Sequence, residues 1–161
     1  MKTISWGKLR KFSDDRGYFA ELFRQGDTPY VQDNISVSCF GAVRGLHLQT
    51  KHPQAKFVIV LSGEIFDVWV DLRTESPSFK KAEYKRLSVL DWISIPAGFA
   101  HGFQALDNNT TVLYKCSDFY HPEDESGIIW NDRDLRIPWP RTAILSDKDQ
   151  TLPTLRETHT Y

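Results

Sequence analysis

Short apolar runs separated by turn residues fill most of the chain, and little of the sequence has helical periodicity. Ser62-Gly63 and Pro96-Ala97-Gly98 are among the separators, and residues of these types favour turns. The runs rich in β-branched and aromatic residues cover 31–39, 56–61, 65–72, 81–87, 92–96, 102–106 and 111–117. Short, regularly spaced strands of this kind predict an all-β sandwich or barrel.

One hairpin of this pattern is apolar on both faces. In VIVLSGEIFDVWVDL, residues 58–72, Asp67 and Asp71 are the charged exceptions near the strand centre and end. A strand that is apolar on both faces is typical of one covered by a second sheet or by another subunit. We therefore expect a buried subunit face here and a homodimer.

The chain becomes polar after Trp139-Pro140. The stretch RTAILSDKDQTLPTLRETHTY, residues 141–161, indicates a short helix or an extended arm that ends in a mobile tail. No internal repeat, low-complexity tract or linker interrupts the pattern. Residues 1–161 are therefore expected to form a single domain.

Composition and charge exclude several classes of partner. The 161 residues are 40% hydrophobic and 13% aromatic, with a net charge of −1, so a sizeable core is expected but no global field that attracts nucleic acid or an anionic membrane. No run approaches the roughly 18 apolar residues of a membrane span, and the N-terminus lacks a signal-peptide core. We expect a cytoplasmic protein in which Cys39 and Cys116 are reduced.

Polar residues interrupt the strand predicted within VRGLHLQTKHPQAKFVIV, residues 43–60. His47 and Gln49 occupy alternate positions and so share one face, while Leu46 and Leu48 point the other way. A histidine and an amide aimed at one place indicate a polar cavity.

GLHLQ and PAGFAH are similar to the two cupin motifs, H-x-H and P-x-G-x-x-H, whose histidines hold a divalent ion in the metal-binding cupins. Here Gln49 stands at the second histidine of the first motif. The stretch in which a carboxylate ligand would follow has no acid and carries Lys51 and Lys56. An ammonium repels a cation, and His47 with His101 alone makes a poor site. We expect no metal and no cofactor.

Without metal, these residue types suit proton transfer beside a carbonyl. The histidine side chain as a type titrates near neutrality, so His47 is a candidate to remove a proton, and a carboxylate on its far nitrogen would stabilise the imidazolium. Tyr114 is a weaker acid that can return a proton from another direction, and Lys56 can stabilise an oxyanion. The product would be an epimer. Taken singly, each residue is more often a satisfied core or rim group, so only their conjunction favours catalysis.

A set of ordered motifs between Asp15 and about Leu155 resembles the dTDP-4-dehydrorhamnose 3,5-epimerase family. Members are cupin-type β-barrel (jelly-roll) homodimers that act without cofactor on nucleotide-linked 4-keto-6-deoxy sugars. The resemblance therefore implies a dTDP-linked 4-keto-6-deoxy sugar as substrate. The motifs are GYFAELF, QDN, VRGLHLQ, GEIFDVWVDLRTESPSF, IPAGFAHGFQAL, LYKCSDFYHPEDE, GIIWNDRDLRIPWP and ILSDKD.

The resemblance also implies the residues of the catalytic centre. His47 of RGLH matches the base and Asp149 of ILSDKD its carboxylate partner. Tyr114 of LYK matches the acid, and Lys56 matches the lysine beside the sugar carbonyl. His101 matches a pocket histidine.

Further positions match the family's substrate-binding residues. Arg16 and Arg44 resemble the arginines that bind the diphosphate, and Glu21 aligns with a carboxylate that the partner subunit delivers to the base. Phe119 stands where relatives often have tyrosine, and it can stack on a pyrimidine or gate the pocket. Gln32 and Asn34 of QDN are expected near the diphosphate.

Three alternatives remain open from the sequence. Relatives with the same base and acid invert only one centre, C3 or C5, or act on other nucleotide sugars. A non-catalytic sugar-nucleotide-binding cupin would share the arginines and aromatic lining but would need no base, acid and orienting carboxylate together. A related keto-isomerase moves protons between carbons 3 and 4, and its pattern lacks the RGLH and WND motifs.

Overall fold

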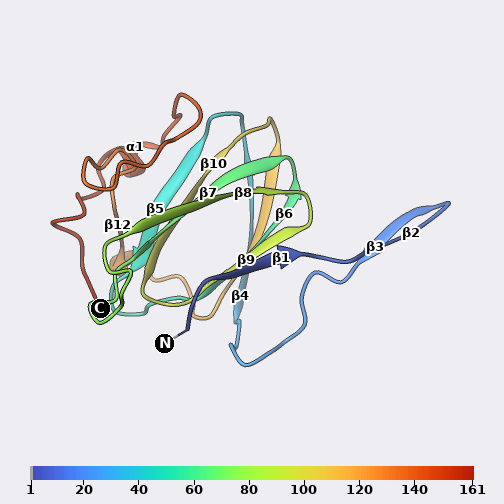
Figure 1. The fold of residues 1–161 in the computed structure, drawn as a ribbon, viewed down its shortest axis with the longest axis horizontal. Helices are drawn as coiled ribbons and strands as arrows, with labels where there is room; N and C mark the ends of the chain where they lie inside the picture. Colours follow the sequence, from blue (N-terminus) through green and yellow to red (C-terminus); the bar gives the residue numbers. More distant parts are fainter. Residues whose placement is uncertain (1) are drawn as a thin grey trace.

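The computed structural model describes residues 2–161. Two antiparallel five-stranded sheets pack against each other, with both termini near one side of the body (Figure 1). The first sheet has the order β1 (Ser5–Lys8), β9 (Asp91–Ile95), β6 (Lys56–Ser62), β11 (Thr110–Cys116), β4 (Gln32–Ser38). The second has the order β12 (Glu125–Gly127), β5 (Val43–Gln49), β10 (Phe99–Ala105), β7 (Glu64–Asp71), β8 (Ala82–Ser88). The predicted all-β, cupin-like fold is confirmed.

In the described part of the chain, helical structure is confined to two short elements. These are the 3₁₀ turn η1 (Pro122–Asp124) and the helix α1 (Asp147–Gln150). Ser146 is the N-cap of α1, and its Oγ accepts a hydrogen bond from the Asp149 backbone N at 3.2 Å. The short helix expected after residue 140 is therefore present. Within residues 2–161 no helix has the length and apolar character needed to span a membrane.

The predicted strands all fall on observed strands, with ends that differ by a few residues. The turn expected before His101 is present at residues 97–98, but the strand predicted at 102–106 begins earlier. His101 lies inside β10, which already begins at Phe99. The short strands β1, β12, β2 (Lys11–Asp14) and β3 (Gly17–Ala20) were not predicted, because strands of three or four residues carry little periodic signal.

Strand β7 is apolar on both faces because two separate clusters cover it. Ile65 and Trp69 face the core between the two sheets. Val68 and Val70 belong to a second cluster, on the outer face, that includes Leu155. The cover on the outer face of β7 therefore comes from the chain's own C-terminal segment, so the inference that its apolar character requires another subunit was wrong.

The expected mobile tail is also wrong, because the last residues are tied to the second sheet. The Tyr161 backbone N donates to the Leu72 carbonyl at 2.8 Å, and the Tyr161 carbonyl accepts from Thr74 N at 2.7 Å. The Tyr161 ring packs against the outer cluster. The outer face of β7 exposes a row of apolar side chains to this segment, and burying them favours docking.

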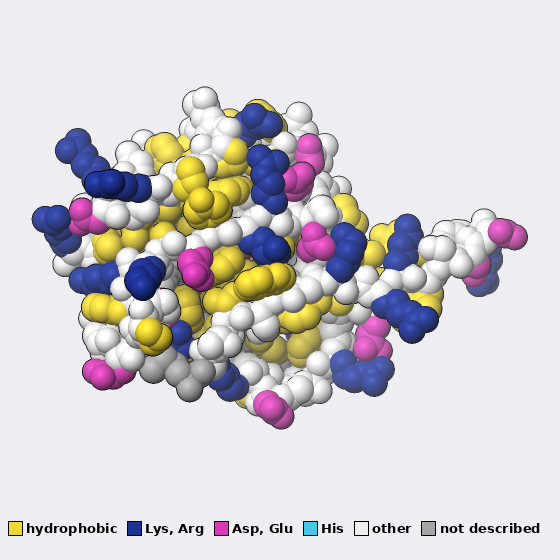
Figure 2. Space-filling model, viewed as in Figure 1, with side chains coloured by type: hydrophobic (Ala, Val, Ile, Leu, Met, Phe, Trp, Pro, Cys, Tyr) yellow, Lys and Arg dark blue, Asp and Glu magenta, His cyan; other side chains and the backbone are white. Residues whose placement is uncertain are grey.

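The hairpin of β2 and β3, here called the arm, stands away from the body of the molecule (Figures 1 and 2). Its apolar side chains meet solvent: Phe12 is 47%, Tyr18 52% and Phe19 66% exposed. Large apolar side chains gathered on a projecting hairpin are typical of a surface that packs against something else.

Candidate active site

A polar cleft lies between the two sheets, and two cavities meet in it. His47, Lys56 and Tyr114 line both cavities and come from β5, β6 and β11. Strand β4 closes one side: its alternation turns Gln32, Asn34 and Ser36 inward and Ile35 and Val37 to the outside.

The pairing of β5 with β10 places two histidines side by side. His47 and His101 are direct cross-strand partners, and the register then shifts, so that Phe103 pairs with Arg44. This bulge brings the backbones together at Gly102, where a Cβ would lie 2.5 Å from the Arg44 carbonyl oxygen. Only glycine fits at that position. The bulge therefore helps to aim both imidazoles at the cleft.

His47 forms a close pair with Asp149. His47 Nε2 lies 2.6 Å from Asp149 Oδ1, and Asp149 Oδ2 accepts a hydrogen bond from Gly45 N at 3.3 Å. Burial by itself raises the pKa of Asp149, but the His47 and Gly45 hydrogen bonds and the Lys148 charge offset this and hold the pKa below its ordinary value. An ionised Asp149 accepts the Nε2 proton, so Nδ1 of His47 carries the free lone pair.

Lys56 and Tyr114 have pKa values shifted by the same cause in opposite directions. Desolvation within the cleft lowers the pKa of Lys56, although the charges of Cys116, Glu125 and Asp67 act against the shift. Burial raises the pKa of Tyr114. At neutral pH the phenol therefore keeps its proton and can act as an acid but not as a base.

A second histidine–carboxylate pair lies beside the first. His101 Nε2 is 2.9 Å from Asp67 Oδ2, and the Asp67 side chain is fully buried. The other carboxylate oxygen, Asp67 Oδ1, is buried with no hydrogen-bond partner among residues 2–161.

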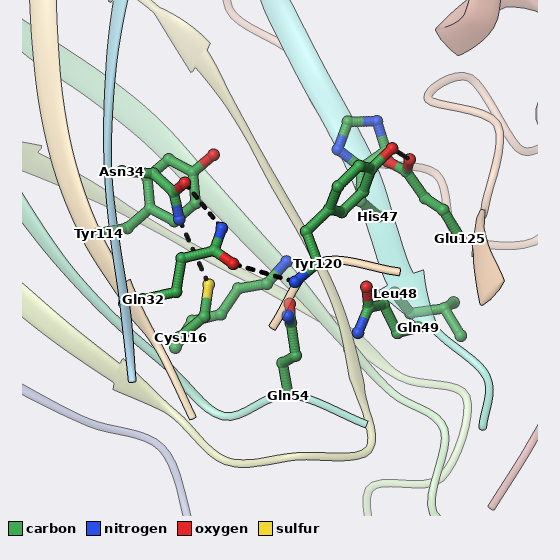
Figure 3. Close-up of a pocket in the computed structure, with 11 residues that line it drawn as sticks. Gln32, Asn34, His47, Leu48, Gln49, Gln54, Tyr114, Cys116, Tyr120 and Glu125 are labelled. Atoms are coloured by element: carbon green, nitrogen blue, oxygen red, sulfur yellow. Dashed lines mark hydrogen bonds between the residues drawn. The ribbon is translucent and has the colours of Figure 1, made fainter. Parts of the chain in front are cut away.

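Gln32, Asn34 and Arg44 lie at the cleft as expected from the sequence. Gln32 Nε2 donates to Asn34 Oδ1 at 2.9 Å, and Gln32 Oε1 accepts from the Tyr120 backbone N at 2.9 Å (Figure 3). Arg44 Nε donates to Ser38 Oγ at 2.9 Å. These contacts hold amide and guanidinium groups along one wall of the cleft.

The sequence analysis missed a group of three linked residues at the cleft, Tyr120, Glu125 and Lys148. Tyr120 OH donates to a Glu125 carboxylate oxygen, which also pairs with Lys148 Nζ. The phenol and carboxylate meet beside the His47 ring in Figure 3. Burial raises the pKa of Glu125, yet the Lys148 and Tyr120 hydrogen bonds leave it below the ordinary value. Lys148 directly precedes Asp149 in ILSDKD, and that adjacency was the available signal.

Three predicted site residues lie outside the lining of the cleft. Phe119 is 59% exposed, and its carbonyl oxygen accepts from Gln54 Nε2 at 2.9 Å. The side chain that lines the cleft at this point is Tyr120. Arg16 lies on the arm, where it pairs with Asp14 at 2.7 Å, and Glu21 pairs with Arg24 at 2.7 Å.

Gln49 lines the same cavity as His47, but its amide is occupied by backbone groups. Nε2 donates to the carbonyls of His52 and Phe119, and Oε1 accepts from His121 N at 2.7 Å. Gln49 therefore joins two loops at the cleft. Across the described chain, 2–161, no three or more His, Cys, Asp or Glu side chains are grouped as a metal site would require.

Comparison with known proteins assigns this chain to a family. The family model for dTDP-4-dehydrorhamnose 3,5-epimerase matches residues 2–157. The chain belongs to this family. A dTDP-4-dehydrorhamnose 3,5-epimerase of Methanothermobacter thermautotrophicus is 45% identical over an alignment of 163 positions, which covers 93% of this chain and 88% of the relative.

Solved structures of relatives share this fold, but their proteins differ in the number of sugar carbons that they epimerise. A dTDP-6-deoxy-D-glucose 3,5-epimerase of Legionella pneumophila, in complex with dTDP-4-keto-L-rhamnose, superposes with a TM-score of 0.92 at 39% identity, covering 97% of this chain and 89% of that one. A 3′-monoepimerase of Streptomyces bikiniensis in complex with dTDP-quinovose has a TM-score of 0.88 at 33% identity, with coverages of 95% and 84%. The fold is thus shared by double and single epimerases.

Proposed function

We propose that this protein inverts C3 and C5 of a dTDP-linked 4-keto-6-deoxy hexose, as a dTDP-4-dehydrorhamnose 3,5-epimerase. The observation that carries the proposal is the position of His47, paired with Asp149, in one cleft with Tyr114 and Lys56. Family membership and a match over residues 2–157 support one epimerase domain across the chain.

The chemistry follows from the ketone at C4. The C–H bonds at C3 and C5 are acidic because loss of either proton gives an enolate whose negative oxygen a cation can stabilise. In this proposal Nδ1 of His47 removes the proton, Asp149 supports the resulting imidazolium, and Lys56 faces the enolate oxygen. Tyr114 then delivers a proton to the opposite face, which inverts the centre.

Double epimerisation is favoured over inversion of C3 alone by sequence similarity. Among the solved structures, the 3,5-epimerase of Legionella pneumophila is 39% identical to this chain, against 33% for the monoepimerase of Streptomyces bikiniensis. The proposed catalytic groups would serve either outcome, because a second inversion needs the same base and acid to meet a second C–H bond after the ring turns.

The nucleotide end of the substrate is assigned to the wall formed by Gln32, Asn34 and Arg44. A guanidinium suits a diphosphate because its fork of N–H donors matches phosphate oxygens. We assign the aromatic contact with the pyrimidine to Tyr120 in place of Phe119, since Tyr120 lines the cleft.

The arm supports a homodimer in which each chain completes its partner's cleft. Besides the arm's own exposed rings, Ile35 and Val37 on the outer face of β4 are 64% and 56% exposed. Two such surfaces on one chain suit an isologous dimer. In this arrangement the arm carries Arg16 to the diphosphate of the partner's cleft and brings Glu21 toward its base.

Turnover in deuterated water tests the epimerase proposal. With dTDP-4-keto-6-deoxyglucose as substrate, deuterium is expected at both C3 and C5 of the product, because each reprotonation draws on exchangeable protons. Label at C3 alone would assign the protein to the monoepimerases. Label at neither carbon would contradict the proposal.

Co-expression of two inactive variants tests whether the arm acts on the partner. In a His47→Ala and Arg16→Ala heterodimer, an arm that acts across the interface leaves one cleft with both residues intact. Random pairing then restores about a quarter of the wild-type activity. An arm that acts within its own chain restores none. Sedimentation of the wild type checks the dimer itself, and an active monomer would refute it.

A further inference from the structure

Asp67 is a buried carboxylate that the proposed reaction leaves without a role. It lies on β7 with no exposed surface, and one of its two oxygens, Oδ1, is buried without a partner among residues 2–161. Burying a carboxylate with an unsatisfied oxygen costs stability. If Asp67 merely filled space or anchored a histidine, an amide of the same shape would do so at lower cost.

The hydrogen bond that Asp67 does make determines which ring nitrogen of neutral His101 carries the proton. Asp67 Oδ2 lies 2.9 Å from His101 Nε2. A carboxylate oxygen can only accept, so in neutral His101 the proton sits on Nε2 and Nδ1 keeps its lone pair. The ring lines the cleft beside His47 and Lys56. No residue in the range 2–161 makes a hydrogen bond to His101 Nδ1.

We propose that Asp67 is a positioning residue that fixes His101 in the Nε2–H tautomer, so that Nδ1 accepts a hydrogen bond from a hydroxyl of the bound sugar. This inference rests on the proposed function and specifies how the site recognises a hydroxyl of the sugar. A hydroxyl donor would be recognised at this position, whereas a group that can only accept would meet a lone pair and be rejected.

In this proposal the two histidines, on neighbouring strands, have different roles: His47 transfers a proton and His101 orients the sugar. His47 has a side chain 28% exposed and faces the reacting carbon, whereas the His101 side chain is 8% exposed. An enclosed acceptor orients a ligand well, because few alternative hydrogen bonds with water compete for it. His101 would hold the ring in place while His47 and Tyr114 act on its C–H bonds.

Calorimetric binding of dTDP and of unreactive dTDP-glucose tests the proposal with Asp67→Asn. The amide can donate to Nε2, which moves the His101 proton to Nδ1 and turns the acceptor into a donor. Binding of dTDP-glucose is expected to weaken about tenfold, while binding of dTDP stays unchanged. An unchanged ratio of the two affinities in both Asp67→Asn and Asp67→Ala would overturn the proposal.

Asp71→Asn is the matched control. Asp71 lies on the same strand and is equally buried, but its oxygens are held by Arg73, Ser76 and Ser78, and it does not line the cleft. This variant is expected to lower the melting temperature without changing the ratio of the two affinities. If it changes the ratio as much as Asp67→Asn does, the effect is structural and the proposal fails.

Nitrogen-15 NMR of histidine-labelled wild-type protein reads the tautomer directly, even if the variants do not fold. His101 is expected to show a protonated Nε2 and an unprotonated Nδ1 near neutral pH, and a protonated Nδ1 overturns the proposal. Failure of the wild type to bind dTDP at all would instead count against the proposed function. The two failures are therefore distinguishable.

Discussion

The cleft contains two histidine–carboxylate pairs that are alike in geometry and different in setting. In the first, Asp149 reaches His47 from a short helix 102 residues further along the chain. In the second, Asp67 reaches His101 from an adjacent strand of the same sheet, and both side chains are nearly enclosed. A histidine–carboxylate contact alone therefore does not identify a base; access to the substrate and the positions of an acid and a cation do.

The difference in setting also determines which structural changes would disrupt each histidine–carboxylate pair. The His47 pair depends on how the C-terminal segment docks, since α1 lies within the polar stretch that begins after Trp139-Pro140. The His101 pair depends on the sheet itself, because β10 is paired with β7 along its whole length. A change that loosens the C-terminal segment should impair the first pair before the second.

The largest expected effect separates the two histidines. His47→Ala should lower kcat by about two to four powers of ten, because no other group in the cleft replaces the base. His101→Ala should act mainly on KM for the sugar nucleotide, since it removes an orienting contact. Steady-state kinetics checks both variants. Equal losses of kcat would mean that both histidines transfer protons.

Tyr114→Phe should separate proton removal from proton return. His47 can still remove a proton and give it back on the same face, so deuterium should enter C3 or C5 faster than epimer forms. Mass spectrometry and NMR of the sugar follow the two rates. Loss of exchange and epimerisation in equal measure, with exchange retained in His47→Ala, would reverse the two assigned roles.

Asp149→Asn should have an intermediate effect on kcat, smaller than that of His47→Ala. The imidazole stays in place, but the amide does not support its charged form and can favour the other tautomer. The comparison with Asp67→Asn is informative, because that variant should change sugar affinity more than kcat. The expected contrast would be lost if both variants produced the same split between kcat and KM.

The pH profile should distinguish Lys56 from Tyr114 as the cause of the alkaline limb. Desolvation lowers the pKa of Lys56, so its proton is lost earlier as pH rises, whereas burial raises that of Tyr114 and keeps the phenol protonated. Activity should therefore fall on the alkaline side as Lys56 deprotonates. Lys56→Arg should move this limb to higher pH, because arginine stays charged. A limb that does not move would exclude Lys56.

The smallest expected effect is that of chelation, which should leave both pairs and the activity unchanged. Gln49 stands where a metal-binding cupin has a histidine, and Lys56 would repel a cation near His47 and His101. Exhaustive dialysis against a chelator, followed by an epimerase assay, measures this. Activity that disappears and returns with one divalent ion would refute it.

The sequence alone predicted the all-β fold, because turn residues and β-branched runs are local signals. Short motifs also singled out His47, Tyr114 and Asp149 as candidate site residues, and the structure places all three at one cleft. Resemblance to a family linked these residues, which are far apart in the chain. Alternation along β5 was sufficient to aim His47 and Gln49 at one face. All of these inferences depend on near neighbours in the chain or on ordered motifs.

Contacts between segments that are far apart in the chain were decided only by the tertiary structure. Only docking of the C-terminal segment shows that β7 is covered by its own chain, that Tyr161 is tied down, and that Lys148 meets Glu125 in the cleft. The pairing of His101 with Asp67 likewise depends on strand register, which a sequence pattern of period two leaves open. Side chains distant in sequence meet only where burial of apolar surface brings their strands together, and that burial is a property of the whole fold.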